Sequence, residues 1–261
     1  MVVAKWGATS DQGIVRSANE DSYVASPPIF VIADGMGGHA AGEIASRIAV
    51  EAFGGLIGRN SLSVTEALAC VEHANAAILA SVHQDDRLAG MSTTITGLIL
   101  VTVGGLEHWM VFNVGDSRVY RFVNRRLGQL TVDHSEVEEM VAAGILTREQ
   151  ARSYRRRNVV TRALGVEPPP IIDSWVFPVA SDDRFIVCSD GLTGELTDSQ
   201  IEERALQVLD PQALAQDLVD LALLAGGRDN ITVIVVDGTH LMDVSEVDEA
   251  TFPNRNRSPS E

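Results

Sequence analysis

Four aspartates stand beside glycine or asparagine where apolar runs of this sequence end or turn. They are Asp34 before Gly35, Asp116 after Gly115, Asp190 before Gly191, and Asp229 before Asn230. An aspartate at a strand end can point its carboxylate into a shared cleft, while a neighbouring glycine lets backbone carbonyls or phosphate come close. Oxygen ligands of this kind suit Mg²⁺ or Mn²⁺ rather than zinc. The pattern predicts a carboxylate site for divalent cations.

Asp-Gly is also a common turn dipeptide, and any one of these pairs taken alone is better explained as a turn. Four occur together, however, and three adjoin strongly apolar runs, at 29–33, 185–188 and 231–236. Strands that arrive from distant parts of a sequence are an effective way to bring carboxylates to one point. The set as a whole therefore favours a functional site over four unrelated turns.

Short runs rich in β-branched residues predict at least six strands. They cover 30–33, 94–103, 109–114, 118–123, 185–189 and 231–236. Only Gly115-Asp116-Ser117 separates the third run from the fourth, which is too short for a crossover helix, so we expect these two strands to pair in antiparallel fashion. This expectation argues against a classical doubly wound parallel sheet.

Helical periodicity predicts two pairs of long helices, each with an apolar face to lay on a sheet. The first pair covers 41–56 and 64–82, and the capping box Ser63-Val-Thr-Glu66 opens its second member. In the second pair, Thr197 with Gln200 caps a helix over 201–209, and Asp210-Pro211 begins a helix that stops at Gly226-Gly227.

The segment between Asp133 and Gly165 is polar and rich in arginine. It contains two short helical patterns, at 137–143 and 148–153, and the run Arg155-Arg156-Arg157. We interpret it as a flap over a site, at about 133–165. From 239 to 261, Pro, Asn, Ser and acidic residues replace the hydrophobic periodicity, which is typical of a disordered tail. The sequence therefore predicts one domain over 1–238, followed by a tail.

The composition of the 261 residues excludes several classes of function. A formal charge of −16 disfavours nucleic acid and anionic membranes as partners, because both require a cationic face. No apolar stretch approaches the roughly 20 residues needed to span a bilayer. Cys70 and Cys188 each lie in an apolar run, so we interpret them as core thiols. We expect a cytoplasmic monomer.

Five motifs in a fixed order give the sequence a family resemblance. They are Arg16-Ser-Ala-Asn-Glu20-Asp21, Asp34-Gly-Met-Gly-Gly-His39, Asn113-Val-Gly-Asp-Ser-Arg118, Ser189-Asp-Gly191 and Asp229-Asn230. In this order they resemble the motifs of the type-2C (PPM) metal-dependent serine/threonine protein phosphatases, and the chain from about Lys5 to Val236 resembles the free-standing bacterial members. The resemblance implies an α+β fold, a four-layer α-β-β-α sandwich of two antiparallel sheets flanked by helix pairs.

The resemblance also implies a set of metal ligands. Asp34 would bridge two Mn²⁺ or Mg²⁺ ions, and Asp190 and Asp229 would complete the first site. The carbonyl of Gly35 would serve the second site together with Glu20, partly through water. Such a pair of cations would lower the pKa of a shared water from about 15.7 towards neutrality and place the hydroxide in line with phosphorus.

Three further roles follow from the same resemblance. Asp21 would hold a metal-bound water, and Asp116 with Asp190 would form a third, weaker metal position. Arg16 would clamp phosphate oxygens with its planar guanidinium group, which lysine cannot replace. The alternative for Arg16 is a surface ion pair with Glu20, four residues further on.

The sequence departs from the family pattern at a few positions. Met36 stands where animal members have a histidine that is proposed to protonate the departing alcohol, so the general acid must be another group or a water molecule. We interpret His39 and His134 as structural. Ser92 and the pair Tyr154-Arg155 replace other residues in loops, where they would affect flap geometry and substrate preference rather than the reaction.

We therefore predict an enzyme that hydrolyses phosphoserine and phosphothreonine in other proteins and opposes a Ser/Thr kinase. Its partners would be phosphorylated proteins and that kinase. The run Arg155-Arg156-Arg157 would help to recruit substrates, or would be a solvated loop. Two alternatives remain open. One is a catalytically silent regulatory or docking relative, against which the intact set of acids weighs. The other is a metal phosphatase for small molecules, because the motifs describe phosphate handling and not the group attached to it.

Overall fold

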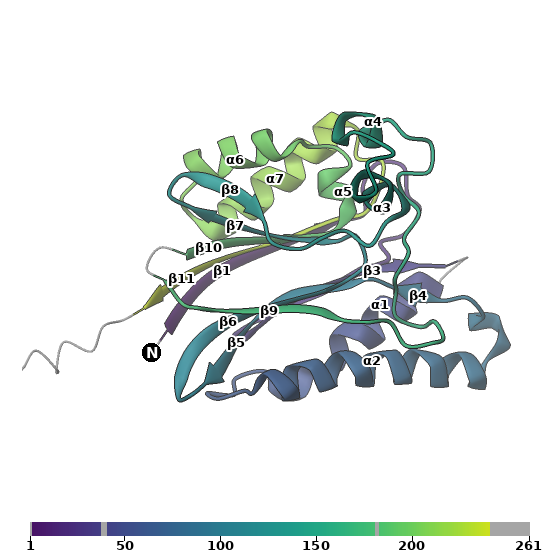
Figure 1. The fold of residues 1–261 in the computed structure, drawn as a ribbon, viewed down its shortest axis with the longest axis horizontal. Coiled ribbons are helices and arrows are strands. Elements are labelled where there is room, and N and C mark those ends of the chain that lie inside the picture. The colour runs from purple at the N-terminus through teal and green to yellow at the C-terminus, as the bar shows by residue number, and fades with distance from the viewer. Residues whose placement is uncertain (1, 38–40, 181–182, 241–261) are drawn as a thin grey trace, which may run out of the picture.

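Two antiparallel β-sheets face each other between two layers of helices in the computed structural model, which describes residues 2–37, 41–180 and 183–240 (Figure 1). The five-stranded sheet has the order β1 (Val2–Asp11), β11 (Ile231–His240), β10 (Asp183–Cys188), β7 (Arg118–Val123) and β8 (Arg126–Gln129). The six-stranded sheet has the order β2 (Asp21–Ser26), β3 (Ile29–Met36), β5 (Ile95–Val103), β6 (Leu106–Val114) and β9 (Asp173–Pro178), with β4 (Ser92–Thr93) paired to β3. This is the α+β sandwich that the family resemblance implies.

Seven α-helices are present among the described residues. They are α1 (Ala41–Glu51), α2 (Val64–Gln84), α3 (Glu136–Ala142), α4 (Arg148–Arg152), α5 (Asp190–Thr193), α6 (Asp198–Gln207) and α7 (Pro211–Ala225), with short 3₁₀ turns at Gly54–Leu56 and Asp86–Leu88. Helices α1 and α2 cover the six-stranded sheet, and α6 and α7 cover the other (Figure 1). None of the helices in the described ranges is long and apolar enough to cross a lipid bilayer.

The central strands are buried on both faces, which explains why their sequences are continuously apolar rather than alternating. In β3, Ile29, Val31 and Ala33 pack with the core under α1 and α2, whereas Phe30 and Ile32 belong to the core between the sheets. That inner core contains Trp109 and Phe185, whose rings meet edge to face at 5.3 Å, among other large side chains. The sheets are thereby held at a fixed separation.

The predicted helix starts are confirmed by their caps. The hydroxyl of Ser63 accepts a hydrogen bond from the backbone N–H of Glu66, and the Glu66 carboxylate accepts one from Ser63 in return. Thr197 forms the same box at α6, and Asp210 caps α7. The helix predicted at 41–56 instead ends at Glu51, before a 3₁₀ turn that begins at Gly54-Gly55, because glycine weakens an α-helix.

The expected pairing of strands 109–114 and 118–123 is wrong. These runs are β6 and β7, and they lie in different sheets: β6 pairs with β5 and β9, and β7 pairs with β10 and β8. The turn Gly115-Asp116-Ser117 does not close a hairpin but carries the chain from one layer to the other. A three-residue connection can join two strands of one sheet or two strands of stacked sheets. Here the strands lie in different sheets, and each packs one face against the core between the sheets and the other against a helix layer. The wider inference holds, because every strand pair in both sheets is antiparallel.

The predicted domain boundary at 238 can be compared with the structure, whereas most of the predicted tail and His39 cannot. Strand β11 continues to His240, where it pairs with Val2, so regular structure extends past the predicted boundary at 238. The remainder of the predicted tail, 241–261, and the predicted structural residue His39 lie outside the described residues.

Candidate active site

A pocket of about 210 Å³ collects seven of the eight residues predicted for the site. These seven are Arg16, Glu20, Asp34, Gly35, Asp116, Asp190 and Asp229, and the wall is completed by Met36, Gly37, Asn158, Val160 and Asn230. The eighth residue, Asp21, is buried, and its Oδ2 accepts hydrogen bonds from the hydroxyls of Ser189 at 2.8 Å and Thr232 at 2.6 Å. Residues from the whole length of the sequence therefore converge on one place.

The stacked sheets explain this convergence. Asp34 lies near the end of β3 in one sheet, whereas Asp190 follows β10 and Asp229 precedes β11 in the other. Asp116 occupies the turn that joins the sheets. The acids therefore come from both layers and from the crossover between them.

Thr94 links Asp34 to the crossover turn. Its hydroxyl accepts a hydrogen bond from the backbone N–H of Asp34 at 3.0 Å and lies 2.9 Å from the hydroxyl of Ser117. The backbone N–H of Thr94 also donates to the carbonyl of Asp34 at 2.9 Å. One buried threonine thus ties together the backbones that carry Asp34 and Asp116.

His134 supports the other side of the same turn. Its Nδ1 accepts a hydrogen bond from the N–H of Gly115 at 3.1 Å, and its own backbone N–H donates to the carbonyl of Gly115 at 2.9 Å. The acceptor role of Nδ1 places the proton on Nε2, which lies 3.0 Å from the carboxylate of Asp173. His134 is 5% exposed and does not line the pocket, so it acts on the turn and not on a ligand.

Asn230 organises the loop that carries Arg16 and Glu20. Its side-chain nitrogen donates to the carbonyls of Gln12 and Ala18, both at 2.8 Å, and its side-chain oxygen accepts from the N–H of Glu20 at 2.8 Å. Sequence reasoning gave Asn230 no role of its own. The only available signal was its position directly after Asp229.

Arg16 pairs with Asp229 rather than with Glu20. Its Nη2 lies 2.6 Å from Oδ2 of Asp229, and this hydrogen bond raises the pKa of Arg16. The Arg16 side chain is half exposed at the pocket, so its other guanidinium nitrogens remain accessible. Arg16 thus lines the pocket, and its ion pair is with Asp229 rather than with Glu20, the alternative considered from sequence.

Two glycines are required by close approaches of the backbone around the site. A Cβ atom on Gly35 would lie 2.2 Å from the carbonyl oxygen of Gly42 and 2.6 Å from that of Glu20. A Cβ atom on Gly191 would lie 1.9 Å from the carbonyl oxygen of Asn230. No side chain fits at either position, which accounts for both Asp-Gly pairs by packing rather than by turn conformation.

Four acids at the site, Asp21, Asp34, Asp116 and Asp190, resist ionisation in the metal-free protein. Burial raises the pKa of Asp21 to about 7 and that of Asp190 to about 6, and nearby carboxylates add to the effect. The pKa values of Asp34 and Asp116 are raised well above the usual range, first by burial and then by neighbouring acids including Asp190. A bound cation would remove this repulsion.

The residues present fit such a cation. Oδ1 of Asp21 is buried without any hydrogen-bond partner, although burying an unpaired carboxylate oxygen is costly. In the ranges that the structure describes, no three acidic, histidine or cysteine side chains are already arranged as a finished metal site, and Asp229 is turned towards Arg16 instead. An unpaired oxygen among mutually repelling acids is the environment that a hard divalent cation with its bound water would satisfy.

The departures from the family pattern differ in whether they line the pocket. Met36 lines it and pairs across β3 and β4 with Ser92. Tyr154 and Arg155 follow α4 and are absent from the pocket lining. No histidine of the described residues lines the pocket, and His39 lies outside those residues.

The comparisons with known proteins agree with this geometry. Residues 16–222 match the family model described as Protein phosphatase 2C. The chain is 39% identical over 242 residues to the serine/threonine protein phosphatase PstP of Mycobacterium tuberculosis, a match that covers 90% of this chain and 45% of that protein. It is 34% identical to the serine/threonine phosphatase stp of Listeria monocytogenes, covering 87% of this chain and 93% of that protein.

The solved structures include the catalytic domain of PstP in complex with two manganese ions. It has a TM-score of 0.82 and 35% identity, and the match covers 92% of this chain and all of that chain. The chain thus spans about half the length of the full PstP protein and the whole of its catalytic domain. Residues from all five motifs line one pocket, and the family model covers most of the sequence, so this chain belongs to the protein phosphatase 2C family.

Proposed function

We propose that this chain hydrolyses phosphoserine and phosphothreonine in proteins and uses two divalent cations, Mn²⁺ or Mg²⁺. The observation that carries the proposal is the convergence of five acids, Gly35 and Arg16 in one pocket from segments spread along the whole chain. The names of the relatives and the two manganese ions bound to the PstP catalytic domain support the same activity.

The acids of the pocket would hold the cations. Asp34 would serve both ions, with Asp190 and Asp229 at the first and Glu20 with the carbonyl of Gly35 at the second; all five residues line the pocket. We also propose that Asp116 with Asp190 forms a third, weaker position. When bound, such cations lower the pKa of coordinated water towards neutrality and stabilise charge on phosphoryl oxygens.

Other residues would orient the substrate and water. Arg16 would bind two phosphate oxygens through its planar fork, exchanging its hydrogen bond with Asp229 for contacts with the substrate. The unpaired Oδ1 of Asp21 would accept a hydrogen bond from an ordered water molecule. Met36 cannot donate a proton, so we propose that water protonates the departing alcohol.

We further propose the biological setting that the sequence suggests. Residues 1–238 would form the catalytic domain, with 133–165 as a flap that includes α3 and α4. The chain would act as a monomer against a Ser/Thr kinase in the cytoplasm. Two cysteines that form no disulfide, Cys70 and Cys188, suit a reducing compartment.

The test is hydrolysis of a phosphothreonine peptide by the purified protein with Mn²⁺, and with Mn²⁺ plus excess EDTA. The variants are Asp190→Ala and, as a matched control, Asp220→Ala on the exposed face of α7. We expect turnover only with free Mn²⁺, a loss of about a hundredfold or more in Asp190→Ala, and no loss in the control. Near-normal activity in Asp190→Ala would show that the metal site is assigned incorrectly.

A sugar phosphate assayed in parallel separates the alternatives. Preference for the sugar phosphate would identify a small-molecule phosphatase. A folded protein that hydrolyses neither substrate would be a silent regulatory relative.

A further inference from the structure

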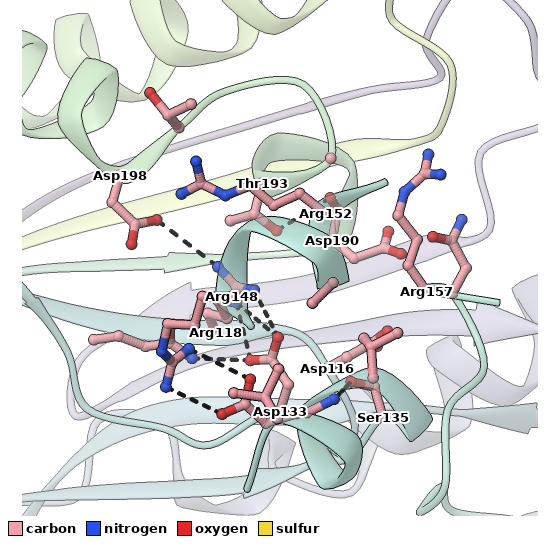
Figure 2. A pocket seen from close by; sticks show the side chains of 18 of the residues that line it. Asp116, Arg118, Asp133, Ser135, Arg148, Arg152, Arg157, Asp190, Thr193 and Asp198 are labelled. Atoms are coloured by element: carbon pink, nitrogen blue, oxygen red, sulfur yellow. Dashed lines mark hydrogen bonds and ion pairs between the residues drawn. The ribbon is translucent and has the colours of Figure 1, made fainter. Parts of the chain in front are cut away.

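A second pocket, of about 310 Å³, lies directly beside the candidate active site (Figure 2). It is formed between the segment that carries α3 and α4 and the segment from α5 to the start of α6. Asp116, Asn158 and Asp190 line both pockets. A ligand held at the active site therefore has the second pocket as its immediate neighbour.

Most acids of the second pocket are already paired with a cation. Asp133 lies 2.6 Å from Arg118, Glu138 lies 3.2 Å from Arg148, and Glu195 lies 2.7 Å from Arg228. Asp198 accepts a hydrogen bond from the hydroxyl of Tyr120 at 3.0 Å and lies 3.8 Å from Arg118. The remaining two acids, Asp116 and Asp190, belong to the candidate active site.

Two arginines of this pocket have no such partner. Arg152, at the end of α4, and Arg157 both line the pocket, and neither guanidinium group forms a hydrogen bond or ion pair with any residue in the described ranges. Arg157 lies close enough to Glu195 to lower the pKa of that acid, but Glu195 already accepts two hydrogen bonds from the guanidinium of Arg228. Figure 2 shows Arg152 and Arg157 around the same pocket as Asp116 and Asp190.

The neighbouring arginines differ in a way that singles out this pair. Arg156 is occupied by an ion pair with Glu136 at 2.7 Å, and Arg155 lines neither pocket. The basic run is therefore not one uniform surface. Its third member, together with Arg152, supplies two unpaired planar donors at the wall of a pocket, an arrangement that favours carboxylate or phosphate.

We propose that Arg152 and Arg157 bind an anionic side chain that flanks the phosphorylated residue of the substrate. The anion is the carboxylate of Asp or Glu, or the phosphoryl group of a second phosphorylated residue. The pocket is large enough for such a side chain, and its shared wall with the active site lets one extended peptide reach both. This inference rests on the proposed protein phosphatase activity and adds a substrate preference to it.

The test compares kcat/KM for phosphothreonine peptides that differ only in their flanking residues. One peptide has glutamine at the three positions on each side, the second has glutamate there, and the third has one flanking phosphoserine. Four enzymes are compared. They are the wild type, the double variant Arg152→Ala/Arg157→Ala, the more conservative double variant Arg152→Gln/Arg157→Gln, and the single variant Arg155→Ala as the matched control. Binding of the same labelled peptides in EDTA, followed by fluorescence anisotropy, gives a readout that does not require turnover.

We expect the wild type to favour the glutamate peptide about tenfold, mainly through KM, and both double variants to lose that preference while their activity on the glutamine peptide is kept. Arg155→Ala should retain the preference. A stronger effect of the flanking phosphoserine would identify phosphate as the preferred anion, and an equal effect would show that a carboxylate suffices. The proposal is overturned if the wild type shows no preference in either assay, or if the double variants keep it. Failure to hydrolyse any peptide would count against the proposed function, while the binding data would still decide on this pocket.

Discussion

Arg16 reaches the active site from a loop without regular secondary structure, so its position depends on neighbours. Its guanidinium group donates a hydrogen bond to Asp229. The side-chain nitrogen of Asn230 holds the loop by donating to two of its backbone carbonyls. Residues 229 and 230 therefore set the position of Arg16, more than two hundred residues away in sequence. The loop and the start of β11 form one functional unit.

Replacement of Arg16 should weaken substrate binding more than it slows turnover. We expect Arg16→Ala to raise KM for a phosphopeptide by about tenfold to a hundredfold, with a smaller change in kcat, because contacts with phosphate oxygens are lost. Arg16→Lys should recover only part of the loss, since lysine cannot bind in a bidentate manner. Steady-state kinetics would check this, with Arg155→Ala as a control. An unchanged KM in Arg16→Ala would remove Arg16 from the phosphate site.

Local sequence marked four acids, Asp34, Asp116, Asp190 and Asp229, because each lies beside glycine or asparagine next to an apolar run, whereas Glu20 was assigned only by the family resemblance. Their partners were not predicted, because nothing local marks them. Asn158 and Val160 enter the pocket from a polar segment without strong periodicity. Asp21 was assigned to the site by resemblance, whereas its burial against Ser189 and Thr232 depends on strands that meet only in the folded chain.

At the scale of elements, the crossover turn between β6 and β7 is the feature that sequence patterns described least well. The apolar runs located both strands, but a turn length does not reveal whether the strands join one sheet or two. Helix starts were predicted well because their capping interactions span only three residues. Strands β1, β2, β4, β8 and β9 were missed because they are short or mix polar and apolar residues, and their pairing with other strands decides their conformation.

His134 should contribute to stability through this turn. In His134→Ala the N–H of Gly115 loses its acceptor and Asp173 loses a donor, and we expect the free energy of unfolding to fall by about 2–3 kcal/mol. Thermal unfolding would measure the change, with His73→Ala on the exposed face of α2 as the control. If the two variants have the same Tm, the hydrogen bonds of His134 do not hold the turn.

At the scale of the whole molecule, the buried acids oppose folding unless their charge is balanced. Asp21, Asp34, Asp116 and Asp190 carry raised pKa values in the absence of a cation. The protein therefore keeps a costly group of carboxylates where its two sheets meet. Their cost should appear in the dependence of global stability on pH.

The metal-free protein should become less stable as pH rises from about 4 to about 7. Folded Asp21 keeps its proton up to a pKa of about 7, and Asp190 up to about 6, whereas an unfolded aspartate loses its proton near pH 3.9. The folded state binds more protons across this window, so a higher pH favours unfolding. We expect the Tm in EDTA to be about 5 °C higher at pH 5 than at pH 7.5, and Asp21→Asn to reduce the difference.

Excess Mn²⁺ should reverse this slope, because the cation binds the deprotonated carboxylates. Calorimetry with EDTA and with Mn²⁺ would separate the two conditions. If the Tm measured in EDTA instead rises steadily from pH 4 to pH 7, these acids are ionised in the folded protein.

The three-residue crossover also has a mechanical consequence. Gly115, Asp116 and Ser117 form a short covalent tether between two stacked sheets, and Thr94 fastens it to the end of β3. If one sheet slid across the other, Asp116 would be displaced relative to Asp34. The close packing between the sheets resists such sliding, and so limits how much the distance between the Asp34 and Asp116 carboxylates can vary. The contact of Trp109 with Phe185, which joins the two sheets, is part of that packing.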